Sequence, residues 1–351
     1  MLIILIVIVG LSLLILGHEA GHFFVAKLFG LKVDEFGFGF PPRIFAIKRG
    51  ETEYSFNWLP FGGFVKIGGE RGEMALGDTL KGNKKSTAER GEKLFYAQPA
   101  WKKSLIMLAG VAINFIIGWI LISVVLMVGT PQTLVITGIQ PDSPAATAGI
   151  MSGDVVKGYT NSQSFIDYIN AHRGEPTQIA VLRNNKEMDF TVTPRVTTTA
   201  DQGAVGVELA AGGTTREPFF PALWDGLQSS VLLLWLTIGA FGTLIAQLFA
   251  HASLLPGVVG PVGIFSMAEE TGKIGLMYLI QLLGIISINL TVVNCLPLPA
   301  LDGGRFLMVI IEKIKGSAIP EKFEAWVNGI GFAMLLILVL LLTIRDIRGL
   351  V

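Results

Sequence analysis

The chain has 351 residues, of which 51% are hydrophobic and 15% are charged. Its mean hydropathy is +0.61, and uncharged apolar stretches of about twenty residues recur along it. This composition excludes disordered, collagen-like and small secreted proteins and indicates an integral membrane protein. The 27 Lys and Arg balance the 27 Asp and Glu, so we expect no nucleic-acid partner, and the single cysteine, Cys295, excludes an intrachain disulfide.

The first candidate membrane helix lies at the N-terminus. Leu2–Leu16 is an unbroken apolar run, and the chain stays mostly apolar through Phe29, interrupted by the polar segment 17–22 and by Lys27. A cleaved signal peptide is the alternative, but no basic residues precede the run and no small-x-small cleavage site follows it. We therefore expect a retained membrane helix.

Three further runs have the length of membrane-spanning helices, at Leu105–Val128, Ile274–Leu296 and Val327–Ile344. Each can cross a hydrocarbon core of about 30 Å at roughly 1.5 Å per residue. A fifth stretch, Val231–Ala250, is also uncharged, so hydropathy alone would count it as another span.

Lys and Arg residues predict the orientation of these helices. Residues 27–103 contain fourteen of them, whereas residues 130–222 contain six. Because basic residues accumulate in cytoplasmic loops, we expect the first segment on the cytoplasmic side and the second on the outer side.

The outer segment has the pattern of a small β domain. Short β-branched runs that alternate with turn residues indicate strands at 133–139, 178–182 and 189–192. The stretch from Gln140 to Val156, with Ser143-Pro-Ala and Gly153-Asp154, resembles PDZ domains, which bind an extended peptide as an added strand. A β domain that only blocks access is the alternative. Thr197–Glu217, rich in Thr, Gly and Ala, is expected to be a linker.

Aromatic and glycine residues fill the first part of the cytoplasmic segment, at 36–42 and 53–67. Strand-like alternation around Trp58 and Val65 predicts a β-hairpin, and its apolar content beside a membrane helix predicts that the hairpin associates with the membrane. Residues 69–92 are polar and charged, and we expect them to form a solvated loop.

The first membrane helix carries the segment His18-Glu19-Ala20-Gly21-His22, an H-E-x-x-H pattern. Residues i and i+4 share one helical face, so both imidazoles can bind one Zn²⁺ while Glu19 faces a water molecule as general base. Histidine and glutamate are costly at membrane depth, and a metal ion would compensate that cost. Two buried histidines with an ion-paired glutamate, or a proton or ion pathway, are the alternatives.

A hydrolytic zinc ion needs three protein ligands and one open position. His172 and His251 are poorly placed for the third ligand, which favours a carboxylate near the cytoplasmic end of another helix. Asp302 has this position, because Pro297 and Pro299 end the third helix and the following Asp-Gly-Gly turns the chain back on irregular backbone. We predict Asp302 as the third ligand, although an aspartate there can also cap a helix.

Together these motifs resemble the site-2 protease family of intramembrane zinc metalloproteases, in its bacterial branch with PDZ domains. The shared order is H-E-x-x-H, a Gly- and Pro-containing segment at 37–41, a Gly-Gly-Phe-Val-Lys strand from Gly62, one PDZ insert, and N-x-x-P-x-P-x-L-D-G-G from Asn294. Well-known members have two PDZ domains, so substrate gating does not transfer by analogy.

The resemblance also implies roles for single residues. They are zinc ligation by His18, His22 and Asp302, general base catalysis by Glu19, and substrate binding by Asn294, Asn289, Gly62, Gly63 and Phe64. A substrate helix must unwind before cleavage, and the hairpin is expected to hold the unwound segment as an added strand.

Parity limits the number of spans, because the zinc motif and Asp302 must reach the same side of the membrane. We therefore expect 223–250 to be an interfacial or re-entrant helix. The predicted segments are a membrane helix with H-E-x-x-H at 1–29, a cytoplasmic loop with the hairpin at 30–100, a membrane helix at 101–129, the PDZ domain at 130–196, a linker and interfacial or re-entrant helix at 197–272, a membrane helix with the Asp302 motif at 273–304, a cytoplasmic loop at 305–326 and a membrane helix at 327–351.

The expected fold is thus a polytopic α-helical membrane protein with about four transmembrane helices, a membrane-associated β-hairpin and an inserted extracytoplasmic PDZ domain. The expected activity is zinc-dependent hydrolysis of peptide bonds within or near the membrane segments of single-span proteins. Anti-sigma factors or remnant signal peptides in the bacterial inner membrane are the substrates that the resemblance implies, with the active site toward the cytoplasm. The bilayer and a peptide ligand of the PDZ domain are further expected partners. A transporter of ions or protons and a catalytically inactive scaffold are the alternative functions.

Overall fold

The computed structural model describes residues 2–70, 93–183, 186–198, 202–251, 259–317 and 319–350. They form two compact units. The membrane unit comprises residues 1–123, 223–272 and 279–351, and the insert unit comprises residues 124–222 and 273–278. The solvated loop expected at 69–92 falls almost entirely on residues 71–92, which lie outside the described residues.

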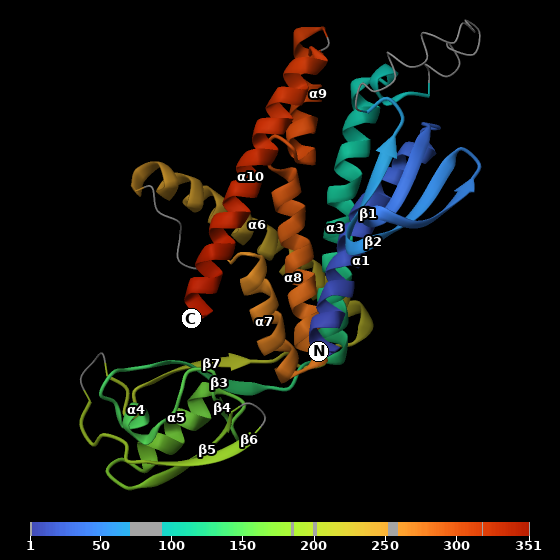
Figure 1. The fold of residues 1–351 in the computed structure, drawn as a ribbon. Helices are drawn as coiled ribbons and strands as arrows, with labels where there is room; N and C mark the ends of the chain where they lie inside the picture. The colour runs from blue at the N-terminus through green and yellow to red at the C-terminus, as the bar shows by residue number, and fades with distance from the viewer. Residues whose placement is uncertain are drawn as a thin grey trace, which may run out of the picture. The chain divides into compact units, whose positions relative to one another are not determined.

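Five helices in the described part of the chain are long and apolar enough to cross a membrane (Figure 1). They are α1 (Leu2–Leu28), α3 (Ala100–Val128), α6 (Phe219–His251), α8 (Leu276–Cys295) and α10 (Glu321–Leu350). Large apolar side chains such as Leu13, Trp235 and Leu340 are exposed along them, as lipid contact requires. The protein is therefore a multi-pass membrane protein. α6 is the ambiguous fifth stretch, and its length fits a crossing and an interfacial helix alike.

Glycines bring α1, α3 and α8 close together. A Cβ on Gly10 of α1 would lie 2.6 Å from Leu283 of α8, and a Cβ on Gly118 of α3 would lie 2.6 Å from Ile288 of α8. Gly21 of α1 approaches the backbone of α3 in the same way, 2.6 Å from the carbonyl oxygen of Ala109. Small residues at helix contacts are the usual means by which membrane helices pack tightly.

The predicted β-hairpin is present and is longer than the sequence indicated. Strands β1 (Val33–Arg49) and β2 (Thr52–Ile67) pair antiparallel, and a short 3-10 helix, η1 (Phe95–Ala97), precedes α3. The first half of β1 pairs on one side with 53–56 and on the other with 63–67, so that 63–67 is an edge of this sheet. Val65 lies on that edge and contacts α1 through Glu19.

Two shorter helices complete the membrane unit. α7 (Pro261–Ile274) packs Ala268 against Val7 of α1 and Leu279 of α8. α9 (Asp302–Lys315) occupies much of the segment for which we expected a cytoplasmic loop, 305–326. The connection between the two spans therefore contains a helix, whose apolar residues lie at helical spacing and whose last turn carries basic residues, as in an amphipathic helix. Its place on the cytoplasmic side stays a prediction.

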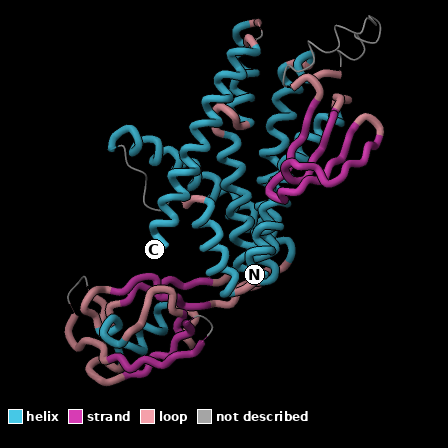
Figure 2. Tube along the Cα trace, in the orientation of Figure 1, coloured by secondary structure: helices cyan, strands magenta, loops and turns pink. Residues whose placement is uncertain are grey.

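The insert unit is a five-stranded sheet with two short helices, and its strands stand out by colour in Figure 2. The strand order is β6-β5-β4-β3-β7, and all neighbours pair antiparallel. The strands are β3 (Thr133–Ile139), β4 (Val155–Val156), β5 (Thr177–Arg183), β6 (Lys186–Val192) and β7 (Val207–Gly212). Its core gathers buried apolar residues of these strands and of α5, among them Leu134, Val181 and Phe165.

The end of this unit differs from the expected boundary at residue 196. Thr197–Glu217, expected as a linker, contains β7, which pairs with β3 from Thr133–Gly212 to Ile139–Val207. Its sequence contains a single β-branched residue, Val207, and ends in Ala, Ala and Gly, so it lacks the run of β-branched residues by which the other strands were recognised. The unit therefore extends past 196, to residue 222.

The PDZ-like stretch folds as local rules predict. Ser143 begins α4 (Pro144–Ala148) by accepting a hydrogen bond from Ala146 N–H at 3.2 Å, and Asn161 caps α5 (Ser162–Ala171) in the same way at Ser164. Asp154 is 1% exposed and accepts two hydrogen bonds of 2.7 Å from the Arg183 guanidinium. The Gly-Asp turn thus anchors β4 to β5 through a buried ion pair.

Candidate metal centre

α1 presents the two histidines of the H-E-x-x-H segment on one face. The helix is continuous from Leu2 to Leu28, so that the four-residue spacing places the rings one above the other. His18 and His22 are 8% and 7% exposed, and their Nε2 atoms are 3.2 Å apart. Two imidazole nitrogens so close together in a buried site are a pair of metal-ligand atoms or a donor and an acceptor.

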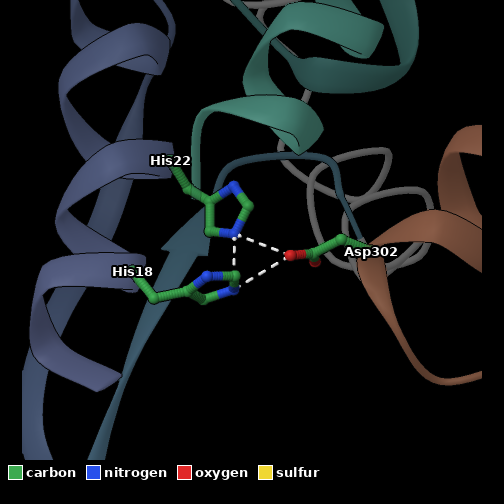
Figure 3. A group of neighbouring side chains, drawn as sticks. All are labelled: His18, His22 and Asp302. Carbon is green, nitrogen blue, oxygen red and sulfur yellow. Dashed lines mark hydrogen bonds and ion pairs between the residues drawn. The ribbon is translucent and has the colours of Figure 1, made fainter. Parts of the chain in front are cut away.

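Asp302 joins them from the start of α9 (Figure 3). Its Oδ2 lies 2.9 Å from His18 Nε2 and 3.2 Å from His22 Nε2. The turn between α8 and α9 sets this position, with Ala300 at a φ of 71° and its N–H donating to Asn328 Oδ1 of α10. Gly303 and Gly304 then pass so close to the backbone of 295–298 that a side chain at either position would collide with it. The irregular backbone expected at this point ends just before Asp302, which is the first residue of α9.

The three atoms fit a zinc ion. Ligands bound at roughly 2.0–2.1 Å in tetrahedral geometry lie about 3.3 Å from one another, close to the separations observed. In the described part of the chain, the buried Asp302 Oδ2 has no close polar neighbour other than the two imidazole nitrogens, as expected for one of three atoms directed at a shared cation.

The second nitrogen of His22 is also engaged. Its Nδ1 lies 2.7 Å from the carbonyl oxygen of Ile106 in α3, an acceptor that requires the proton on Nδ1. This tautomer leaves the Nε2 lone pair directed at His18 and Asp302. A backbone carbonyl is a common outer partner of metal-binding histidines.

Glu19 lies next to the histidines on α1 and touches the hairpin. The backbone N–H of Val65 in β2 donates to Glu19 Oε2 at 3.1 Å. The carboxylate is therefore held between the candidate metal centre and the edge 63–67 of the hairpin. That position suits a residue that must exchange protons with a substrate bound along this edge.

The residues predicted to bind substrate lie on the hairpin and on α8. Gly62 and Gly63 lie on β2 beside α1, and a Cβ on Gly63 would lie 3.4 Å from Leu16 and 3.8 Å from Glu19. Phe64 contacts Gly37 of β1 and lies beneath the Lys66 ammonium, 5.1 Å from its ring centre.

The two asparagines of α8 have different surroundings. Asn289 Oδ1 accepts a hydrogen bond of 2.8 Å from Thr237 of α6, so its side chain joins two helices. Asn294 is half-buried, and its side chain has no hydrogen-bond partner within the described ranges. Among the described contacts, the Asn289 amide is engaged through its oxygen, whereas both ends of the Asn294 amide are unpaired.

The other histidines do not take part in the described site. His172 belongs to the insert unit, where its Nδ1 is 2.9 Å from the Tyr168 carbonyl oxygen. The side chain of His251 lies outside the described residues. Where the structure describes acidic, histidine and cysteine side chains, His18, His22 and Asp302 are the three that converge, with ligand atoms within 4.8 Å of one another.

Several residues beside the site were not identified from the sequence. Asn114 of α3 lies 3.2 Å from His18 Nδ1, and Gly110 lies against both imidazole rings, where a Cβ would collide with His22 Nε2. Arg305, three residues after Asp302, forms an ion pair with Glu70 at the end of the hairpin. The one available signal was Asn114 itself, a polar residue inside an uncharged membrane helix.

Comparisons with known proteins agree with this geometry. The family described as peptidase family M50 matches residues 6–338. A Clostridium perfringens protein named as a zinc metalloprotease is 32% identical, with 98% of each chain covered. The regulator of sigma-W protease RasP of Bacillus subtilis is 30% identical, with 96% of each chain covered. The zinc metalloprotease RasP of Geobacillus kaustophilus is also 30% identical, with 97% of this chain and 96% of the relative covered.

Proposed function

Because the chain belongs to peptidase family M50, the site-2 class of intramembrane zinc metalloproteases, we propose that His18, His22 and Asp302 bind its catalytic zinc and that Glu19 is its general base. The protein is a zinc-dependent metalloendopeptidase that crosses the membrane several times. One observation supports these residue roles. The Nε2 atoms of His18 and His22 on α1 converge with a carboxylate oxygen of Asp302 on α9, while Glu19 lies beside the two histidines on α1.

The mechanism follows from these positions. His18, His22 and Asp302 would hold the zinc ion, which would supply a Lewis acid able to polarise a peptide carbonyl and to activate a water molecule near neutral pH. Glu19 takes a proton from the attacking water as the new C–O bond forms. It then gives that proton to the amide nitrogen as the C–N bond breaks, which yields a carboxylic acid and an amine.

The hairpin edge provides a place for the scissile segment. Residues 63–67 pair with β1 on one side only, and Val65 on this edge is bonded to Glu19. An unwound substrate that adds as a strand here would satisfy its own backbone groups and bring a carbonyl near the metal centre. The free amide of Asn294 is the second candidate contact with that backbone.

The hairpin also has the surface of a membrane-associated element. Ile44, Phe45, Ile47 and Trp58 are large apolar residues that are 49–68% exposed. Such a patch on a segment beside membrane helices fits contact with lipid or with an apolar substrate. The substrates we propose are single-span membrane proteins. The printed name of one relative, regulator of sigma-W protease, makes anti-sigma factors one candidate class, and remnant signal peptides are the other.

Helix contacts support four crossings, with α6 only partly inserted. α6 contacts Trp119 of α3 near its start and Asn289 of α8 through Thr237. The next helix, α7, packs against the first turns of α1 and α8. The chain therefore returns to the same end of the unit before α8 begins. With the Lys and Arg distribution, this favours an active site toward the cytoplasm of a bacterial inner membrane.

The insert unit is the proposed PDZ domain, on the outer side of the membrane. Its strand β7 is an edge of the sheet and lies near α5, which leaves backbone groups for an added peptide strand. The alternative, a domain that only blocks access, predicts that extended peptides do not bind to the purified full chain. Peptide binding measured by fluorescence anisotropy separates the two.

The residue roles are tested by zinc content and cleavage of a single-span substrate by the purified full chain. Glu19→Gln should keep one zinc per chain and lose at least about 10²-fold in cleavage, because the general base is removed and the ligands remain. His22→Ala should lose the zinc. His172→Ala is the matched control and should change neither. Wild-type cleavage by Glu19→Gln, or full zinc content in His22→Ala, would refute the proposal.

A further inference from the structure

Asn114 is a buried amide whose polar atoms are only partly used. It lies in the middle of α3 and is 1% exposed. Its Nδ2 position lies 3.2 Å from His18 Nδ1, whereas its Oδ1 position is buried and has no hydrogen-bond partner among the described residues. Ser287 of α8 fixes the backbone here by donating to the Asn114 carbonyl oxygen at 2.7 Å. A buried polar side chain without full satisfaction costs stability, so this one calls for a functional reason.

The chemistry of His18 decides which end of the amide faces it. The oxygen and nitrogen of a side-chain amide have nearly the same shape, so their assignment follows from the hydrogen bonds that each must make. If the NH₂ group faced His18, Nδ1 would be an acceptor and Nε2 would carry the proton, which prevents metal binding. If the oxygen faces His18, Nδ1 carries the proton and the Nε2 lone pair is free for zinc.

The geometry of α3 explains why an acceptor is available at both rings. The Ile106 carbonyl points along the helix toward residue 110, and the side chain of Asn114 tilts back toward the same level. Gly110 lies between them and has no side chain, so both imidazoles fit against the helix there. Ile106, Gly110 and Asn114 thus lie at four-residue spacing on one face of α3. Ile106 contacts Nδ1 of His22 and Asn114 contacts Nδ1 of His18.

We infer that Asn114 is a positioning residue of the metal centre, whose side-chain oxygen accepts the Nδ1–H of His18 and so holds the tautomer and ring orientation in which Nε2 binds zinc. The inference rests on the zinc ligation proposed above. It adds an outer partner for His18 equivalent to the Ile106 carbonyl for His22. Removal of such partners lowers metal affinity about 10- to 100-fold in other zinc sites.

The test compares two replacements of Asn114 in the purified full chain. Asn114→Leu keeps the size of the side chain but removes the acceptor, and Asn114→Asp keeps an oxygen acceptor. Zinc retention is measured against a series of chelators of graded affinity. We expect about 10- to 100-fold weaker zinc binding in Asn114→Leu and binding within about threefold of the wild type in Asn114→Asp.

Ser123→Ala is the matched control. Ser123 is also fully buried on α3, but its hydroxyl donates only to Trp119 of its own helix, so zinc affinity should not change. Wild-type zinc affinity in Asn114→Leu, or equal losses in the Leu and Asp variants, would overturn the role of Asn114. The zinc affinity of the Asn114 variants does not test the proposed protease function. A wild type that binds zinc but cleaves no membrane substrate would overturn that function and leave the role of Asn114 standing.

A measurement on the unmodified protein avoids any folding defect of the variants. The ¹⁵N spectrum of ring-labelled histidine in the wild type should show a protonated Nδ1 on each of the two histidines whose Nε2 signals shift when zinc binds, His18 and His22. An unprotonated Nδ1 would contradict the inference whatever the variants do.

Discussion

The candidate metal centre and the core of the insert unit both contain buried polar groups. The hydrogen-bond partners of these groups lie at different distances along the chain in the two regions. In the insert unit, the buried Ser143 and Asp154 each accept a hydrogen bond from an N–H group three residues away, and Asp154 also meets Arg183 on a neighbouring strand. In the membrane unit, His22 and His18 meet their partners on α3 across 84 and 96 residues. The turns of the insert unit therefore follow largely from local sequence rules, whereas the candidate metal centre forms only when separate helices are packed.

The largest effect that separates the two regions should come from Gly110→Ala. The added methyl group would collide with His22 Nε2 and lie 2.8 Å from His18 Cε1, so the rings or α3 must move. A displacement of about 1 Å at such a site costs roughly 10²-fold in activity, and we expect loss of that order together with weaker zinc binding. Cleavage rate and zinc content measure both.

Gly239→Ala is the matched glycine control. Gly239 lies on α6 with no other atom within 4 Å of an added Cβ, so the substitution should leave zinc content and cleavage unchanged. If both glycine variants lost activity equally, tight packing at Gly110 would not be the cause.

The insert unit should respond most strongly to Asp154→Asn. The change removes the charge from a buried ion pair whose Arg183 side chain is 20% exposed. We expect the free energy of unfolding of this unit to fall by about 2–3 kcal/mol, somewhat below the roughly 3–5 kcal/mol of a fully buried pair. Hydrogen exchange of 133–212 in the full chain measures the loss, and the zinc content should stay the same.

The same carboxylate predicts how the insert unit responds to acid. Burial would raise the pKa of Asp154, but hydrogen bonds from Arg183 and from the Met151 N–H lower it below its usual value. Because the folded pKa lies below the unfolded one, the stabilisation is full above about pH 4 and is lost as the pH falls through the folded pKa. Hydrogen exchange between about pH 5 and pH 2 should show the free energy of unfolding of this unit decreasing as the pH falls. Asp154→Asn should reduce the slope of that decrease. A slope of equal size in the variant would assign it to other groups.

The smallest effect should come from Lys157→Ala in the same unit. Lys157 pairs with Glu187 at 2.6 Å, but the two side chains are 55% and 52% exposed. Exposed pairs contribute about 0–1 kcal/mol, so the free energy of unfolding should change by less than about 1 kcal/mol. A loss as large as that of Asp154→Asn would show that burial does not explain the difference between the two pairs.

Sequence patterns predicted the long helices because uncharged apolar runs of that length have few alternatives in a membrane protein. β3 was predicted residue for residue, since its β-branched run ends at turn residues on both sides. β7 was taken for a linker because Ala and Gly are poor strand formers, and only its pairing with β3 makes it a strand. The helix α5 was not predicted, because it is only 10 residues long, too short for a clear helical period, and only the Asn161 cap marks its start.

The candidate site could be predicted only in part. His18, Glu19 and His22 carry their geometry within one helical turn, and the Asp302 motif marks its own turn by proline and glycine. Asn114 and Gly110 carry no such local pattern, because their roles depend on which face of α3 meets α1. The long-range fold creates those contacts, so a single sequence does not reveal them.

The hydrogen bond from Val65 to Glu19 has a consequence for fidelity. Glu19, the proposed general base, and the strand proposed to receive the substrate are joined by one N–H group. A chain that stays helical cannot extend along that strand, however near it comes to the metal. Binding of an extended segment and its cleavage would thus occur at the same place. Membrane helices that stay folded would not be cleaved, whereas unwound segments would be.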